Sequence, residues 1–213
     1  MMQINQSELS LRDNITANSH GNLELFKMLL QPHFLFNSLN NLYALSVKRS
    51  DQTADAIAGL SALLTRVVSA LRRNYITLED EVNLIEEYIK LENIWLQETS
   101  FLLDFQVSGE LDKVMIPPLL IYTFVENSFK HGIRKCSGKG WLTIKILVKS
   151  NTLFFRINNL VPSIQEDDRN GEQEGLGIVA ARELLDNKCY GRYHLETGRK
   201  GNVYSVDLRI ENV

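Results

Sequence analysis

The chain has 213 residues, of which 44% are hydrophobic and 23% are charged, with a net charge of −3. This composition is that of ordinary globular protein, long enough for one large domain or two small ones, and it excludes disordered, collagen-like and low-complexity classes. The nearly balanced charge gives no reason to expect a nucleic-acid partner. Cys136 and Cys189 form neither a disulfide framework nor a zinc motif, so we expect reduced, buried thiols.

The sequence shows no signal peptide and no apolar stretch approaching the roughly 20 residues that a membrane helix needs. We therefore expect a soluble chain. A cytoplasmic piece of a membrane-anchored protein is compatible with that expectation.

The first half of the chain is poor in glycine and predicts long helices. One helical stretch runs from about Asn22 to Val47, and Pro32 inside it predicts a kink near Met28–Pro32. A second stretch runs from about Thr53 to Arg73. Its apolar residues step by three and four, as in a helix bundle, and are Ile57, Leu60, Leu64, Val67 and Leu71. A hairpin of two antiparallel helices cannot bury an apolar seam on each helix by itself. We therefore expect two hairpins to form a homodimeric four-helix bundle.

A third helix is expected from Thr77, an N-cap with Asp80 three residues on, to about Glu98. Four strands with one buried face follow from alternation around 101–107, 142–148, 153–157 and 204–210. Further helices are expected from Pro117–Pro118 to about His131 and from about Leu176 to Asn187, with a long polar loop at 160–174. The fold class is therefore α+β, with a helical part before about residue 75.

The first motif with chemical meaning surrounds His33. His33, Asn37, Asn40 and Asn41 share one helical face between apolar neighbours. A neutral imidazole can attack phosphorus, and Asn37 one turn later can orient the ring or the incoming phosphoryl group. The alternative is a buried or capping histidine within a polar core network.

The second motif is Glu126-Asn127-Ser-Phe-Lys-His131-Gly132. Asn127 and His131 share a helical face; an amide oxygen suits Mg²⁺, and a histidine one turn on can reach a phosphate. Glu126 points to another side of the helix. The alternative is an ordinary amphipathic helix that ends at a glycine C-cap.

The third motif is Glu174-Gly-Leu-Gly-Ile178, which opens a helix after the long loop. Glycines at a helix N-terminus let backbone N–H groups approach a phosphate, so Gly175 and Gly177 are candidate binding residues. The alternative is a plain turn from loop to helix.

These three motifs occur in an order that resembles a known family. The chain is similar to the cytoplasmic part of sensor histidine kinases of the LytS-like subfamily, through Pro-His33-Phe-Leu-Phe-Asn, Val-Glu-Asn127-Ser-Phe-Lys-His-Gly and Gly175-Leu-Gly-Ile. The resemblance implies a linker (1–21), a phosphoacceptor and dimerisation hairpin (22–75) and a Bergerat-type ATP-binding domain (76–213). In that domain, helices cover one face of a mixed sheet.

The resemblance also implies roles. His33 takes the γ-phosphoryl group of ATP, Asn127 holds Mg²⁺, His131 contacts phosphate, and Gly175 and Gly177 shape the phosphate edge beside a lid at 160–174. Asn159 aligns with the residue that accepts from the adenine amino group. The partner is a response regulator whose aspartate receives the phosphoryl group, and the family's upstream segment is a transmembrane sensor, which would make this chain a cytoplasmic, membrane-anchored piece.

The chain departs from the family pattern at several positions. Asn158-Asn159-Leu-Val-Pro162 stands in place of Asp-x-Gly-x-Gly, Ala180 in place of an asparagine, and Trp95 in place of an arginine. Phe34 follows His33 where an acidic residue would serve as base, which leaves Glu126 as the candidate base. The function predicted is an ATP-dependent histidine kinase. A dimeric pseudokinase that signals by conformation is the alternative from the class of binding proteins, and a serine kinase or ATPase of the same superfold is a third.

Overall fold

The computed structural model describes residues 32–96, 101–136, 140–162 and 176–213, and in places only the backbone of a residue. The helices are α2 (Pro32–Val47), α3 (Thr53–Leu71), α4 (Leu78–Trp95), α5 (Leu120–His131), the short 3-10 helix η1 (Ile133–Lys135) and α6 (Leu176–Cys189). The strands are β1 (Ile76–Thr77), β2 (Phe101–Ser108), β3 (Met115–Ile116), β4 (Gly140–Lys149), β5 (Thr152–Leu160), β6 (Tyr193–Lys200) and β7 (Val203–Glu211).

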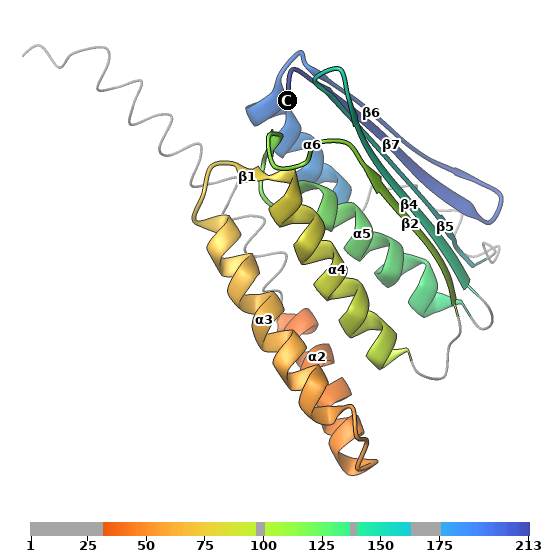
Figure 1. Cartoon of the computed structure of the whole chain (residues 1–213). Coiled ribbons are helices and arrows are strands. Elements are labelled where there is room, and N and C mark those ends of the chain that lie inside the picture. Colours follow the sequence, from red (N-terminus) through yellow and green to blue (C-terminus); the bar gives the residue numbers. More distant parts are fainter. Residues whose placement is uncertain (1–31, 97–100, 137–139, 163–175) are drawn as a thin grey trace, which may run out of the picture.

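The main sheet has five strands in the order β2-β4-β5-β7-β6. β2 is parallel to β4, whereas the β4–β5, β5–β7 and β7–β6 pairs are antiparallel. Figure 1 shows α5 and α6 against one face of this sheet, with α4 outside α5 and the α2–α3 hairpin outside α4. The predicted α+β class, with helices on one face of a mixed sheet, is confirmed.

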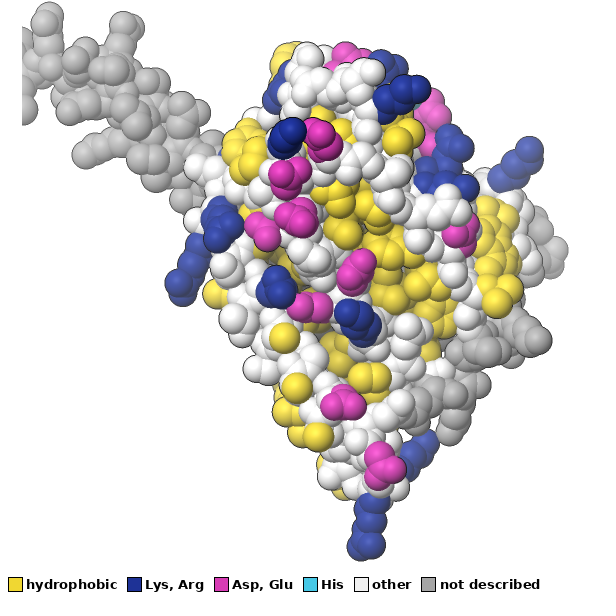
Figure 2. Space-filling model, in the orientation of Figure 1, with side chains coloured by type: hydrophobic (Ala, Val, Ile, Leu, Met, Phe, Trp, Pro, Cys, Tyr) yellow, Lys and Arg dark blue, Asp and Glu magenta, His cyan; other side chains and the backbone are white. Residues whose placement is uncertain are grey.

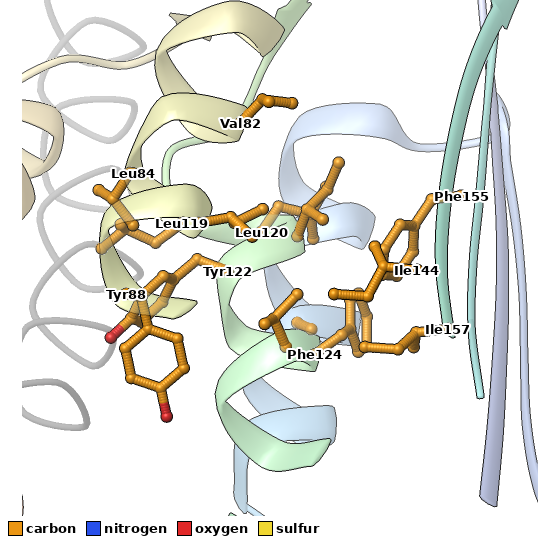
Figure 3. Close-up of a cluster of buried hydrophobic side chains, with 14 of the residues drawn as sticks. Val82, Leu84, Tyr88, Leu119, Leu120, Tyr122, Phe124, Ile144, Phe155 and Ile157 are labelled. Carbon is orange, nitrogen blue, oxygen red and sulfur yellow. The ribbon is translucent and has the colours of Figure 1, made fainter. Parts of the chain in front are cut away.

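The alternation in the strands places the apolar residues on the helix-facing side of the sheet. Ile157 of β5 lies opposite Ile144 of β4 and Val206 of β7, and all three are buried. In Figure 3, Phe124 of α5 points toward Phe155 and Ile157 of the sheet. This apolar layer is the floor on which α5 rests.

On its other side, α5 packs against α4 through aromatic rings. Tyr88 of α4 lies 5.2 Å from Tyr122 and 5.5 Å from Phe129 between ring centroids, both in edge-to-face geometry. Such pairs add about 0.5–1.5 kcal/mol beyond the burial of their area. α5 is thus enclosed between the sheet and α4 (Figure 3).

One predicted helix begins later than expected, and the strand β6 of the main sheet was not predicted. α5 begins at Leu120 rather than at the prolines, because Leu119 adopts a left-handed conformation (φ 64°) just before it. β6, with the sequence Tyr-His-Leu-Glu-Thr-Gly-Arg-Lys, lacks the apolar alternation that identified the other strands. The predicted kink near Met28–Pro32 lies at the edge of the described residues, and its start lies outside them.

α3 contradicts the expectation that no stretch is long and apolar enough for a membrane span. By length and composition alone α3 meets that criterion, since Asp55 and Arg66 are its only charged residues. Its contacts are nevertheless those of a bundle helix. The side chains that it buries are Ala56, Leu60, Leu63, Val67 and Ala70. Only Leu60 and Val67 of the predicted seam belong to this set, and Ile57 is 53% exposed.

The hairpin is joined to the rest of the chain through α4. Thr77 caps α4 by accepting a hydrogen bond from the Asp80 N–H at 3.1 Å, as predicted. Arg66 of α3 pairs with Glu87 of α4 at 2.7 Å. Gly59 lies where a Cβ would touch Leu91 at 3.6 Å. Figure 2 shows acidic side chains over the solvent-facing side of α4 in this orientation.

The N-terminus of α5 is capped from α4 by Glu81, whose side chain is fully buried. The carboxylate accepts hydrogen bonds from the backbone N–H groups of Leu119 and Ile121, both at 2.9 Å, and of Tyr122 at 3.0 Å. Burial raises the pKa of Glu81 to about 7, although the three N–H groups lower it.

Beyond the other end of α5, a second contact with α4 involves Glu92, which is also fully buried. Arg134 of η1 donates to Glu92 through two guanidinium nitrogens: Nε donates to Oε2 at 3.0 Å, and Nη2 donates to Oε1. The guanidinium also lies 5.7 Å above the Trp95 ring, in cation–π geometry. α4 therefore holds the segment that contains α5 at its first turn and again just after its last turn.

We expect Arg134→Ala to lower the free energy of unfolding by about 3 kcal/mol, because it leaves the Glu92 carboxylate buried without a cation. Urea unfolding measures this loss. The double variant Glu92→Gln, Arg134→Met removes both charges and should be less destabilised than Arg134→Ala alone. Equal losses in the two variants would contradict a paired contribution.

Candidate functional site

The polar residues of the second motif lie near the C-terminal end of α5, as predicted. α5 buries Tyr122, Phe124, Val125 and Phe129, while Asn127 is partly exposed and His131 is exposed. The helix ends at Gly132, whose N–H donates to the Ser128 carbonyl at 3.0 Å. The expected C-cap is therefore present, and the polar face of the last two turns reaches the surface.

Asn127 lies against the first turn of α6. A Cβ atom added at Gly177 would come within 2.3 Å of Asn127 Nδ2, so only glycine allows this approach. Asn127 Nδ2 is buried and has no hydrogen-bond partner among the described residues. A buried donor without a partner costs about 1–3 kcal/mol, and an incoming acceptor would recover that cost.

Asn159 continues the inward-facing series of β5 two residues after Ile157, and it is 1% exposed. Its Nδ2 donates to the Leu160 carbonyl at 3.0 Å, which commits the amide nitrogen. Its Oδ1 is buried and without a partner in the described part of the chain. The free atom at this position is therefore a hydrogen-bond acceptor.

Gly132 packs against Asn159 and was not singled out as a functional residue by the sequence. A Cβ at Gly132 would lie 2.1 Å from Asn159 Nδ2 and 2.7 Å from the Leu160 carbonyl oxygen. The glycine that ends α5 thus also makes room for the Asn159 amide. In the sequence it was visible only as a C-cap.

The two titratable residues of this end of α5 have shifted pKa values. Burial raises the pKa of Glu126, while Lys130 and Arg134 lower it and Glu92 raises it. Burial lowers the pKa of His131, and Lys135 and Lys130 lower it further. The lowered pKa favours the neutral His131 ring, in which one ring nitrogen carries a hydrogen that it can donate.

The structure brings Asn127, Gly177, Gly132 and Asn159 together around the C-terminal half of α5. Gly175 and most of the predicted lid lie outside the described residues. His33 belongs to the first turn of the described α2, and its side chain is likewise outside the description. Asn37 is partly exposed on α2. In Figure 1, α4 stands between the α2–α3 hairpin and α5.

A protein-only metal cage is not found within the described ranges, where no group of three or more His, Cys, Asp and Glu side chains could hold an ion. Mg²⁺ is commonly held by one or two protein oxygens together with phosphates and water. The Asn127 amide oxygen is the protein ligand that the motif offers for such a site.

Known proteins are similar to this chain over the segments that contain the described helices. The family model described as Histidine kinase matches residues 22–100. The sensor protein LytS of Staphylococcus epidermidis is 25% identical over 181 residues, which cover 85% of this chain and 28% of that protein. The sensor histidine kinase YpdA of Escherichia coli is 26% identical over 196 residues, covering 88% and 34%. The resemblance to the LytS-like sensor histidine kinases is confirmed.

The chain thus spans about a third of the length of the LytS-like relatives named here. Among solved structures, the catalytic domain of the histidine kinase ThkA matches with a TM-score of 0.49 at 16% identity, over 65% of this chain and 97% of that domain. The family model reaches the hairpin and α4. The relatives extend over most of the chain, including α5.

We expect Gly177→Ala to weaken binding of Mg·ATP by about tenfold or more, a loss of about 1.4 kcal/mol, because the new methyl group displaces Asn127. Isothermal titration calorimetry measures this change. Gly198→Ala is the matched control, since a Cβ at Gly198 meets nothing within 4 Å. Equal affinities of the two variants would contradict the role of the Asn127–Gly177 contact.

Proposed function

We propose that this chain is the kinase module of a two-component sensor, which transfers the γ-phosphoryl group of ATP to His33 and then to an aspartate of a response regulator. The observation that supports it best is the pair of buried amides, Asn127 and Asn159, each with one atom unpartnered among the described residues and each next to a glycine. Asn127 belongs to α5, the helix whose sequence resembles the asparagine motif of the LytS-like kinases, and Asn159 lies against Gly132 at the end of that helix.

The Asn159 amide suits an adenine base. Adenine offers an exocyclic amino group, a donor, where guanine offers a carbonyl oxygen. Because Nδ2 is committed to the Leu160 carbonyl, the free Oδ1 would accept from that amino group and would be mismatched with guanine. An aspartate at this position would accept with charge, whereas the asparagine does so without it. The substitution in this chain therefore preserves the acceptor.

The Asn127 and His131 side chains suit the phosphates. Asn127 Nδ2 is a buried donor without a described partner, and the neutral His131 ring can donate to a phosphate oxygen without carrying charge. We assign Mg²⁺ to the Asn127 amide oxygen, where the ion would neutralise phosphate charge. Gly175 and Gly177 would complete the phosphate edge from the start of α6.

In the proposed step, a ring nitrogen of His33 forms a bond to the γ-phosphorus as the bond to the β–γ bridging oxygen breaks and ADP leaves with that electron pair. The ring proton must go to a base. We assign that role to Glu126, because burial raises its pKa toward the range of a general base. Asn37, one turn after His33, would orient the ring. The phosphohistidine then passes its phosphoryl group to the regulator's aspartate.

The position of α4 separates the proposed phosphoacceptor helix from the proposed nucleotide site. In Figure 1, α4 lies between the α2–α3 hairpin and α5. A phosphoacceptor on α2 and a nucleotide bound at α5 would therefore lie on different sides of α4. A domain movement would bring them together, and a sensor could act on that step. We place the chain on the cytoplasmic side of a membrane, below a transmembrane sensor segment, by analogy with the family.

The homodimer is supported by an apolar stripe on α2. Phe36, Leu39, Tyr43 and Val47 recur at helical spacing and are 63%, 56%, 71% and 64% exposed. Ile57 of α3 adds a further exposed apolar side chain. A stripe of this length on an isolated hairpin indicates a partner, and a second hairpin completes a four-helix bundle.

We expect the wild-type chain to incorporate phosphoryl label from Mg·ATP in an acid-labile, base-stable form, because a P–N bond to histidine is hydrolysed in acid. His33→Ala should abolish the label. His194→Ala, an exposed histidine on β6, is the matched control and should retain it. A folded wild-type chain that binds Mg·ATP but takes up no label would favour the pseudokinase instead.

We expect Leu39→Glu to convert the dimer to a monomer, because it places a charge in the proposed interface while leaving the sheet untouched. Sedimentation or light scattering measures the mass. Leu102→Glu changes another exposed leucine, which is 73% exposed on β2, and should leave the mass unchanged. A monomeric wild-type chain, or a dimeric Leu39→Glu variant, would argue against the stripe as the interface.

A further inference from the structure

The single side chain of Glu81 makes the hydrogen bonds that two residues share in an ordinary helix N-cap. In a capping box, a side chain at the N-cap accepts from the N2 or N3 backbone, and an acidic side chain at N3 accepts from the N-cap backbone. Here Leu119 is the N-cap residue and has no side-chain oxygen. Glu81 Oε2 accepts from the N–H of Leu119, and Oε1 accepts from those of Ile121 and Tyr122. The sequence of α5 provides neither half of this box.

The left-handed backbone of Leu119 belongs to the same arrangement. A non-glycine residue at φ 64° costs roughly 1–2 kcal/mol. Leu119 is fully buried, and its N–H donates to the same carboxylate as the N–H groups of the first turn. The hydrogen bonds to Glu81 offset this backbone cost. The start of α5 is therefore defined by a residue of another helix.

A cap supplied from another helix does more than a local cap. A serine or aspartate at position 119 would satisfy the N–H groups wherever α5 happened to lie. Glu81 satisfies them only when α5 stands at one distance and one rotation relative to α4. The twelve residues from Glu81 to Glu92 make about three turns, which matches the length of α5, and Glu92 holds Arg134 beyond its far end.

The residues that depend on this placement are those of the candidate site. Asn127 lies about one and a half turns after Tyr122, the last of the capped residues, and it fits against Gly177 with no space for even a methyl group. Gly132 fits against Asn159 in the same way. A shift of α5 by a fraction of an ångström would therefore move both amides against their glycines.

We propose that Glu81 is a positioning residue of the nucleotide site, whose carboxylate sets the place of α5 and thereby brings Asn127 and His131 to the phosphates. This inference rests on the proposed function for the identity of the ligand, Mg·ATP. The geometric part of the inference is independent of the proposed function, because Glu81 holds α5 whether or not a nucleotide is present. Glu81 itself touches no phosphate-binding residue.

The first experiment compares Glu81→Gln with wild type by calorimetric titration with Mg·ATP. A glutamine offers one acceptor oxygen in place of two, and its amide N–H groups would face backbone N–H groups. We expect the affinity to fall by about tenfold or more in the folded protein. Glu86→Gln, an exposed residue on the same helix, is the control and should bind like wild type. Unchanged affinity of a folded Glu81→Gln variant would overturn the proposal.

A second measurement uses the protein without nucleotide. The side-chain amide signals of Asn127 in a ¹⁵N–¹H spectrum should shift in Glu81→Gln and stay in place in Glu86→Gln. A cap that only stabilised the fold would lower the melting temperature and leave those signals unmoved, which would refute positioning. If wild type fails to bind Mg·ATP while the Asn127 signals do shift, the proposed function fails and the positioning role stands.

A third measurement needs no variant and applies if Glu81→Gln does not fold. Coupling between two sites is reciprocal, so a ligand that needs α5 in place must stabilise the cap in return. We expect saturating Mg·ATP to slow hydrogen exchange at the amides of Leu119, Ile121 and Tyr122 by about threefold or more relative to Mg²⁺ alone. The Val67 amide of α3 is the internal control. Equal protection with and without nucleotide would overturn the proposal.

Discussion

A buried carboxylate facing the backbone of a helix from a different helix is the contact on which this structure depends. Burying a charge costs several kcal/mol, and three N–H donors together with the positive end of the helix dipole are what offset it at Glu81. The balance is close, since burial still raises the pKa of Glu81 to about 7. The result is a fixed spacing between α4 and α5. This spacing sets the position of every α5 residue that we assign to nucleotide binding.

The candidate site is built from neutral amides that are oriented by their surroundings. Asn159 gives its nitrogen to the Leu160 carbonyl, so its oxygen is the atom that remains. The Asn127 amide packs closely against Gly177, so this contact restricts its rotation where its Nδ2 has no hydrogen bond within the described part of the chain. In both places a glycine lets backbone and amide approach closely. The departures from the family pattern thus leave a candidate site that carries less charge, and its two amides are still held in place by their neighbours.

Much of this architecture could be predicted from the sequence because it is periodic. Strand alternation identified β2, β4, β5 and β7, and the same period places Asn159 on the buried side two residues after Ile157. The strand β6 was not predicted because it lies at the edge of the sheet and buries little: Leu195 is its one buried side chain, and the polar Thr197 takes the next position on that face. The N-cap of α4 could also be predicted, because Thr77 and Asp80, the residues that form it, are only three positions apart in the sequence.

The residues that could not be predicted act across the fold. Glu81 looks in the sequence like one of three acidic residues in the first turn of α4, a common feature that favours the helix dipole. Its burial depends on the backbone of Leu119, 38 residues later. The Glu92–Arg134 pair likewise joins positions 42 residues apart. A local sequence pattern does not indicate which acidic side chain will accept hydrogen bonds from backbone groups that are distant in the sequence.

The parallel pairing of β2 with β4 has a consequence for how α5 can move. The chain must return along the sheet between two parallel neighbours, and α5 lies on that return path. A connection of this kind limits how far α5 can slide along the sheet, but it limits rotation about the helix axis less. One residue step is 100° of such rotation, enough to replace Asn127 by Glu126 or Ser128 opposite Gly177. Glu81 at the start of α5 and the Glu92–Arg134 pair just beyond its end both connect this segment to α4, and so both resist that rotation.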